Sequence, residues 1–254
     1  MTTSESRAGY TAEIRVERIG SVTVLTVSNP ARRNALTRSL AVELAAAVQR
    51  CEADDGIGAL VVTGDPPAFC AGGDPAEIAS GGEPALREVY AGFLAVAQCA
   101  LPTVAAVNGV AVGAGLNLAL ACDVRLAGPE ARFDARFLQL GLHPGGGYTW
   151  MAQRALGPQG AAALTLFGEV LDAAEAERSG LVWRQAADVV PAAVELAARA
   201  AAAPRELALT TKRTLSLAAG EATHAEIIEV ELREQIASLT TPEFAARLAE
   251  LRRR

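Results

Sequence analysis

The chain has 254 residues, of which 51% are hydrophobic, 4% aromatic and 20% charged, and its formal net charge is −6 at pH 7. This length is enough to bury a large core in one domain with a smaller appendage, and the negative charge argues against nucleic acid as a general partner. The sequence shows neither an N-terminal secretion signal nor an uninterrupted apolar run of about 18 residues, so we expect a soluble cytoplasmic protein with no membrane partner.

Strands and helices alternate along the first half of the chain. Short β-rich runs predict strands at residues 13–18, 22–27, 59–64, 103–107, 123–127 and 132–134. Between them we expect a helix capped by Thr37 and a second helix through residues 86–96, which follows a flexible joint at Gly81-Gly82. Polar loops are predicted at residues 28–34 and 65–74. The later strands lack apolar and polar alternation, which favours an α/β core whose strands are covered on both sides.

The last third of the chain is predicted to be helical. The expected helices are residues 161–167, 172–179, 189–203, 206–219, 223–238 and 242–254. The last three are rich in Leu, Ile and Ala, so we expect them to pack on a neighbouring element or subunit rather than to stand in water.

The four cysteines indicate no metal site. Cys51, Cys70, Cys99 and Cys122 have spacings that match no zinc pattern, and three of them lie in apolar contexts. We therefore expect buried, reduced thiols.

The stretch from Pro102 to Gly115 is the segment around which we expect the chain to be organised. A strand ends at Asn108-Gly109, and Gly113-Ala114-Gly115 then leads into a helix-forming run. The small residues let a ligand lie against the backbone, and the helix start directs unpaired N–H groups and a positive dipole end at it. Such a site suits an oxygen that gains negative charge, such as a thioester carbonyl becoming an enolate. The alternative is a glycine-rich corner kept small for packing.

Several ordered motifs resemble one family, the enoyl-CoA hydratase/isomerase (crotonase) superfamily. The similarity covers residues 13–254. Its motifs are Asn29-Pro30 with Arg33-Asn34-Ala35-Leu36, Val61-Val62-Thr63-Gly64 with residues 68–74, Val107-Asn108-Gly109 with Gly113-Ala114-Gly115, and residues 121–127, 141–147 and 172–182.

The resemblance implies an α/β fold of the ClpP/crotonase type, a spiral of β-β-α repeats with a C-terminal helical trimerisation region. It divides the chain into a core at residues 1–195, which carries the acyl-CoA site, and a helical region at residues 196–254. It further implies a homotrimer or a dimer of trimers, an acyl-CoA thioester as partner, and no cofactor beyond the coenzyme A of the substrate.

By motif position the resemblance assigns the site residues. The family's oxyanion hole carries over to the backbone N–H groups of Gly73 and Ala114. Basic side chains near the nucleotide of coenzyme A would be Arg32, Arg33 and Lys212, with plain surface charge as the alternative for each. The implied substrate-binding residues are Arg33, Asn34, Ala35, Leu36, Ala71, Asp74, Phe137 and Gly145.

Two positions depart from the family's pattern. The two catalytic glutamates of the hydratases correspond to Asn117 and Phe137, and neither side chain can exchange a proton near neutral pH. His143 is the first candidate to replace them, against a structural role in its turn, because histidine exchanges protons near neutral pH. Asp134 follows, unless it faces away or pairs with Arg136, and Glu130 and Asp74 come after it, with Asp74 expected to brace its own loop.

Three functions are compatible with these residues. The first is an enoyl-CoA hydratase/isomerase-type lyase or isomerase of fatty-acid or related acyl-CoA metabolism, in which an unorthodox group such as His143 or Asp134, or a water molecule held by Asn117, handles the proton. The second is a non-catalytic acyl-CoA-binding protein of the same fold. The third, a scaffold oligomer or a serine hydrolase, is disfavoured because the sequence has no Gly-x-Ser-x-Gly motif and only two histidines.

Overall fold

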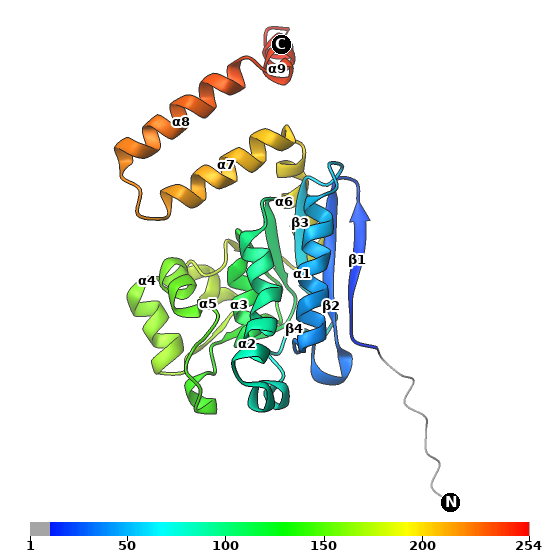
Figure 1. Cartoon of the computed structure of the whole chain (residues 1–254), viewed down its shortest axis with the longest axis vertical. Coiled ribbons are helices and arrows are strands. Elements are labelled where there is room, and N and C mark those ends of the chain that lie inside the picture. Colours follow the sequence, from blue (N-terminus) through cyan, green and yellow to red (C-terminus); the bar gives the residue numbers. More distant parts are fainter. Residues whose placement is uncertain (1–10, 254) are drawn as a thin grey trace, which may run out of the picture.

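The computed structural model describes residues 11–253, and the first ten residues of the expected core lie outside this range. The described chain forms two sheets, covered by helices (Figure 1). The larger sheet has the order β1 (Glu13–Ile19), β2 (Val22–Ser28), β3 (Ala59–Gly64), β5 (Thr103–Val107), β7 (Val124–Ala127) and β10 (Arg184–Gln185). The smaller sheet has the order β4 (Ala68–Cys70), β6 (Val110–Val112), β8 (Arg132–Asp134) and β9 (Val170–Asp172).

The chain builds both sheets by repeating one unit. Each unit places one strand in the larger sheet, a short strand in the smaller sheet and then a helix: β3-β4-α2, β5-β6-α3 and β7-β8-α4. Neighbouring strands from successive units are parallel in both sheets. The helices of these units are α2 (Pro75–Gln98), α3 (Ala114–Ala121) and α4 (Tyr148–Leu166). The predicted α/β spiral of β-β-α repeats is therefore confirmed.

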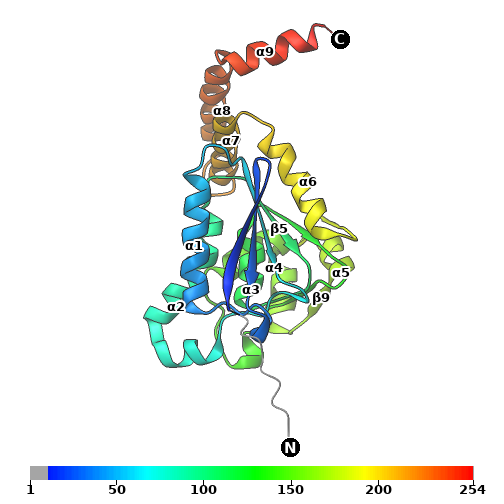
Figure 2. The same cartoon turned by 90° about the vertical axis from the view of Figure 1, so that its right-hand side faces the viewer.

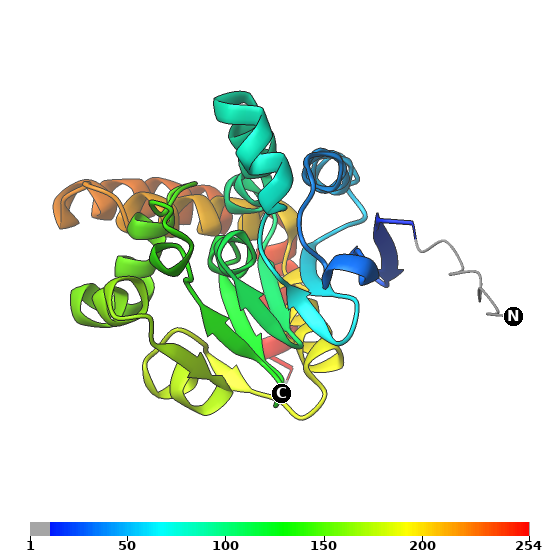
Figure 3. The ribbon, with the colours of Figure 1, turned by 90° about the horizontal axis from the view of Figure 1, so that it is seen from below.

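Helices cover both faces of the larger sheet. The helix α6 (Val189–Ala201) packs through Val189, Ala193 and Ala197 on one face, and α1 (Arg38–Glu52) lies with α2 on the other (Figures 2 and 3). All six residues of β3 are buried, which explains why its sequence lacks an alternation of apolar and polar residues. The short helix α5 (Ala173–Arg178) begins with a capping box.

The last three helices extend from the body of the molecule (Figure 1). They are α7 (Arg205–Ala218), α8 (His224–Leu239) and α9 (Pro242–Leu251). Large apolar side chains on them are exposed, among them Leu215, Ile236 and Leu251. Their role in trimerisation and the division of the chain at residue 195 stay predictions.

The structure corrects four local expectations. The predicted loop at residues 65–74 contains the strand β4. The strands β6, β9 and β10 were not expected, because strands of two or three residues are too short to show a period. The helix expected at 161–167 belongs to the part of α4 that follows a kink at Gly157, whose φ is 67°, and the helical part from Tyr148 to this kink was not expected. The segment α2 begins at Pro75, earlier than expected, and it is kinked at Gly82, whose φ of 56° and ψ of −149° are not helical, so the break in the chain lies at the expected joint. All four cysteines are buried and free, as predicted.

Candidate functional site

A cavity of about 370 Å³ opens where β4 and β6 end and α3 begins. Of the sequence-predicted site residues, it brings together Gly73, Ala114, His143, Asn117, Ala71, Phe137 and Gly145. Further lining residues include Ile78, Leu86, Val89, Tyr90, Val112, Arg136, Leu140 and Leu142. Most of the lining residues are apolar, Arg136 and His143 are lining residues with basic side chains, and none of the described lining residues is Asp or Glu.

The backbone at Gly73 is oriented by a short parallel bridge to Leu36. Leu36 N donates to Gly72 O at 2.7 Å, and Asp74 N donates to Leu36 O at 3.0 Å. In such a bridge the N–H of the middle residue faces away from the partner strand. Among residues 11–253 the N–H of Gly73 has no protein acceptor, and Gly73 lines the cavity.

The amide of Ala114 lies at the start of α3. Gly113 precedes the helix with φ 52° and ψ −113°, a conformation that favours glycine, and its carbonyl accepts from Asn117 N at 3.0 Å. Ala114 is therefore the first helical residue, and its N–H has no intrahelical acceptor. No other acceptor for it exists in the described part of the chain. The cavity thus receives two unpaired amides from two separate segments.

Close approach of the backbone keeps these segments together. A Cβ on Gly115 would lie 2.0 Å from Cys70 O, so only glycine allows α3 to start this near the end of β4. Burial raises the pKa of the Cys70 thiol to about 11, which keeps the thiol protonated at neutral pH. Cys70 is therefore a packing residue beside the site and not a nucleophile.

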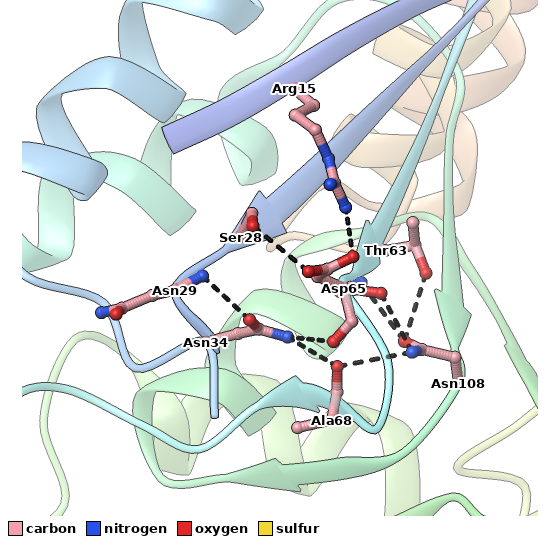
Figure 4. Close-up of polar contacts among 9 residues, drawn as sticks. Arg15, Ser28, Asn29, Asn34, Thr63, Asp65, Ala68 and Asn108 are labelled. Carbon is pink, nitrogen blue, oxygen red and sulfur yellow. Dashed lines mark hydrogen bonds and ion pairs between the residues drawn. The ribbon is translucent and has the colours of Figure 1, made fainter. Parts of the chain in front are cut away.

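Two asparagine side chains brace the turn that leads into β4 (Figure 4). Asn34 Nδ2 donates to Asp65 O at 2.7 Å and to Ala68 O at 2.8 Å, and its Oδ1 accepts from Asn29 N at 3.0 Å. Asn108 Nδ2 reaches the same Ala68 carbonyl at 3.4 Å. Asn34 is 1% exposed and does not line the cavity. In this structure its polar atoms hold the protein's own backbone.

The other predicted substrate-binding residues outside the cavity lie beside this turn. Ala35 and Leu36 are buried, and Arg33 is exposed with φ 49°. Asp74 caps α2 by accepting from two amides of its first turn, and it forms an ion pair with Arg32. In this structure Asp74 therefore stabilises the start of α2, while its role toward a substrate stays a prediction.

Asn117 and Phe137 both line the cavity. Asn117 is 1% exposed; its Nδ2 donates to Gly145 O at 2.9 Å, and its Oδ1 has no partner among the described residues. The ring of Phe137 packs on Tyr148 with centroids 5.1 Å apart. At the two positions that depart from the pattern of the resembled family, the chain thus places an amide and a phenyl ring against the cavity.

The remaining acid and base candidates occupy different places. His143 is exposed at the cavity rim, and its Nδ1 lies 2.7 Å from Pro144 O. Asp134 is 5% exposed, forms an ion pair with Arg136 and does not line the cavity. Glu130 is not a lining residue either. Of these three, only His143 can meet a ligand in the cavity.

Sequence reasoning did not assign the α2 wall of the cavity. Leu86 and Val89 were expected on a core face of the helix, and Tyr90 carried no local signal. The Tyr90 hydroxyl lies against Gly145, since a Cβ on Gly145 would come within 2.1 Å of the Tyr90 oxygen.

Lys212, a candidate contact for the nucleotide of coenzyme A, pairs with Asp123 at 2.7 Å, and its side chain is 14% exposed.

The chemistry available to the site is anion stabilisation by two amides in an apolar cavity. Within residues 11–253 no three His, Cys, Asp or Glu side chains gather as metal ligands. In the same range none of the helices combines the length and apolarity that crossing a bilayer requires.

Comparison with known proteins shows which family shares these features. The sequence model of enoyl-CoA hydratase/isomerase matches residues 17–244. A probable enoyl-CoA hydratase of Mycobacterium tuberculosis, EchA14, is 53% identical over 242 residues, which covers 92% of this chain and 94% of that protein. The 2,3-dehydroadipyl-CoA hydratase of Escherichia coli K12 is 36% identical over 187 residues, 73% of this chain and 72% of that enzyme.

Solved structures agree with this family. A putative enoyl-CoA hydratase from Streptomyces coelicolor superimposes with a TM-score of 0.87 at 31% identity, covering 100% of this chain and 97% of the other. An enoyl-CoA hydratase from Bacillus anthracis gives a TM-score of 0.89 at 25% identity, with 95% and 96% covered.

Proposed function

Because the chain belongs to the enoyl-CoA hydratase/isomerase family, we propose that it is an acyl-CoA enzyme whose Gly73 and Ala114 amides form an oxyanion hole for a thioester enolate. The observation that carries the proposal is that Gly73 and Ala114 line one cavity and that the N–H groups of both residues lack protein acceptors within the described range. Loss of one such donor costs roughly 3 kcal/mol of transition-state stabilisation in other enzymes.

A proline scan of helix starts tests this assignment. Ala114→Pro deletes the N–H at the first helical position, where proline fits without breaking the helix. His224→Pro is the matched control, because it makes the same change at the first residue of α8. We expect Ala114→Pro to lower kcat/KM for a trans-2-enoyl-CoA by about 100-fold or more and His224→Pro to leave it unchanged. A folded Ala114→Pro protein within threefold of wild type would refute the oxyanion assignment.

A non-catalytic acyl-CoA-binding protein is the second candidate. It is favoured by the lack of any carboxylate among the described lining residues, with Asn117 and Phe137 at the positions of the family's glutamates. Calorimetry with a short enoyl-CoA, followed by hydratase, isomerase, hydrolase and decarboxylase assays, separates the two. Tight binding without turnover in every assay identifies the binder, and turnover in any of them identifies the enzyme.

Two finer features complete the proposal. The exposed apolar side chains of α7 to α9 support a homotrimer or a dimer of trimers, which light scattering of the purified protein measures directly. Arg33 is exposed and is the proposed contact for the nucleotide of coenzyme A. The proposed pathway is fatty-acid or related acyl-CoA metabolism in the cytoplasm.

A further inference from the structure

Arg136 brings a permanent positive charge to a cavity whose lining residues are mostly apolar. Three consecutive residues, Ala135, Arg136 and Phe137, line the cavity. The side chain of Arg136 is 53% exposed, so a ligand can reach its guanidinium. The other basic lining residue is His143, and none of the described lining residues is Asp or Glu. The described lining residues therefore carry a net positive charge, which attracts an anionic ligand.

Asp134 anchors the guanidinium of Arg136. The two side chains form an ion pair, and the carboxylate side chain is 7% exposed and does not line the cavity. The strand β8, which carries Asp134, is paired with β6 on one side and with β9 on the other, so the carboxylate has a fixed place. Within residues 11–253 the guanidinium contacts no other acceptor, and it has five N–H donors. A ligand can therefore bind the remaining donors while Asp134 holds the group in place.

The backbone of Arg136 has a conformation that few arginines adopt. Its φ of 53° lies in the left-handed region, which favours glycine and asparagine. Such backbone is found disproportionately at functional sites. A Cβ on Gly113 would lie 3.9 Å from both Ala135 O and Phe137 Cε1. The two neighbours of Arg136 in the chain thus lie close to the residue that precedes the Ala114 amide, within the reach of an acyl chain bound there.

We infer that Arg136 is a specificity-determining residue that binds a carboxylate on the acyl chain, so that the preferred ligand is the coenzyme A thioester of a dicarboxylic acid. The inference rests on the proposed acyl-CoA function and specifies its ligand class. A planar guanidinium forms paired hydrogen bonds with a carboxylate, whereas a plain acyl chain offers it no acceptor after water has left the cavity. The phosphates of coenzyme A are the other anionic groups that could bind Arg136, and the experiment separates these two sources.

The experiment compares pairs of thioesters that differ in a terminal carboxylate. Malonyl-CoA is paired with propionyl-CoA, glutaryl-CoA with pentanoyl-CoA, and adipyl-CoA with hexanoyl-CoA, and calorimetry on the full-length protein measures their dissociation constants. Both members of a pair have the same phosphates and the same number of acyl carbons, so their ratio reports the carboxylate. We expect the dicarboxylic member of at least one pair to bind about tenfold more tightly than its partner.

Substitution assigns this ratio to one side chain. Arg136→Gln removes the charge and keeps a side-chain N–H donor, and it should reduce the ratio to about one. Arg136→Asn makes the same test if the glutamine variant does not fold, because asparagine tolerates a positive φ. Arg132→Gln is the matched control and should retain the ratio, because Arg132 is exposed on the same strand as Asp134 and does not line the cavity.

Each contrary result has a distinct meaning. A wild-type ratio below about two in all three pairs would overturn the inference, while the proposed function would stand on the binding of the monocarboxylic thioesters. A ratio that Arg136→Gln retains, or that Arg132→Gln loses equally, would also overturn it. Equal weakening of both members of a pair by Arg136→Gln would assign Arg136 to the phosphates of coenzyme A instead. Failure of all six thioesters to bind would remove the proposed function and the inference with it.

Discussion

Replacing Asn34 by glycine tests whether this residue braces the turn before β4 or contacts coenzyme A. Asn34 is 1% exposed and has a φ of 61°, which strains most side chains. Asn34→Gly removes the side chain without adding strain. The matched variant Asn34→Ala removes the same hydrogen bonds but keeps a Cβ at this left-handed position, which alanine tolerates less well than asparagine or glycine.

The structure sets the expected magnitudes. The side chain makes three hydrogen bonds to backbone groups of Asn29, Asp65 and Ala68. At about 1 kcal/mol net for each bond, Asn34→Gly should lower the free energy of unfolding by about 3 kcal/mol. Asn34→Ala should lower it by about 1 kcal/mol more, because alanine is disfavoured at positive φ.

Urea denaturation at one fixed protein concentration measures both variants, since an oligomer's stability depends on concentration. Calorimetry with a short acyl-CoA reports the binding. If the Asn34 side chain touched coenzyme A and did not brace the turn, both variants would weaken binding with little change in stability. An Asn34→Gly protein within 0.5 kcal/mol of wild type, on the order of a surface substitution, would refute the brace.

Two further predictions concern packing beside the cavity. Gly115→Ala should lower the free energy of unfolding by about 3 kcal/mol, because its Cβ would lie 2.0 Å from Cys70 O. Gly128→Ala is the control and should be nearly neutral, because its Cβ would have its nearest neighbour at 3.4 Å. Thermal denaturation measures both variants. Burial raises the pKa of the Cys122 thiol from 9.0 to about 12. Above pH 9 the unfolded chain therefore loses this proton while the folded chain keeps it, so the free energy of unfolding falls as the pH rises from 9 toward 12. Between pH 8 and 10, the free energy of unfolding from urea denaturation should fall by about 1 kcal/mol less for Cys122→Ala than for the wild type, and equal losses would contradict the buried, protonated thiol.

The sequence predicts the parts of this fold that local physics determines. The strands at 59–64 and 103–107 follow from uninterrupted β-rich apolar runs, and the Thr37 cap follows from its side-chain chemistry. The strand β4 could not be predicted, because its three residues are extended only through pairing with β6.

The same division holds for the cavity. The motifs predicted that Gly73 and Ala114 share one site, and both residues line the cavity, although their roles stay predictions. The contribution of Tyr90 had no signal, because a helix face that borders a cavity has the same apolar period as one that borders the core. Arg136 is equally unpredictable, since its φ of 53° and its place in the cavity wall arise from the chain around it.

The composition of the cavity separates anion stabilisation from proton transfer. An enolate is negatively charged, so a wall without carboxylates and with two backbone amides favours it more than a wall with two glutamates would. The amides lie on backbone that β4, β6 and α3 hold in place, whereas the motif resemblance predicts that the family's proton-transfer groups are side chains at the positions of Asn117 and Phe137. Because the amides are backbone groups and the proton-transfer groups are side chains, a substitution at Asn117 or Phe137 leaves both N–H groups in the chain. The proposed acyl-CoA site can therefore persist in this fold while its proton chemistry passes to another residue, and we propose His143, whose imidazole lines the cavity, for that role.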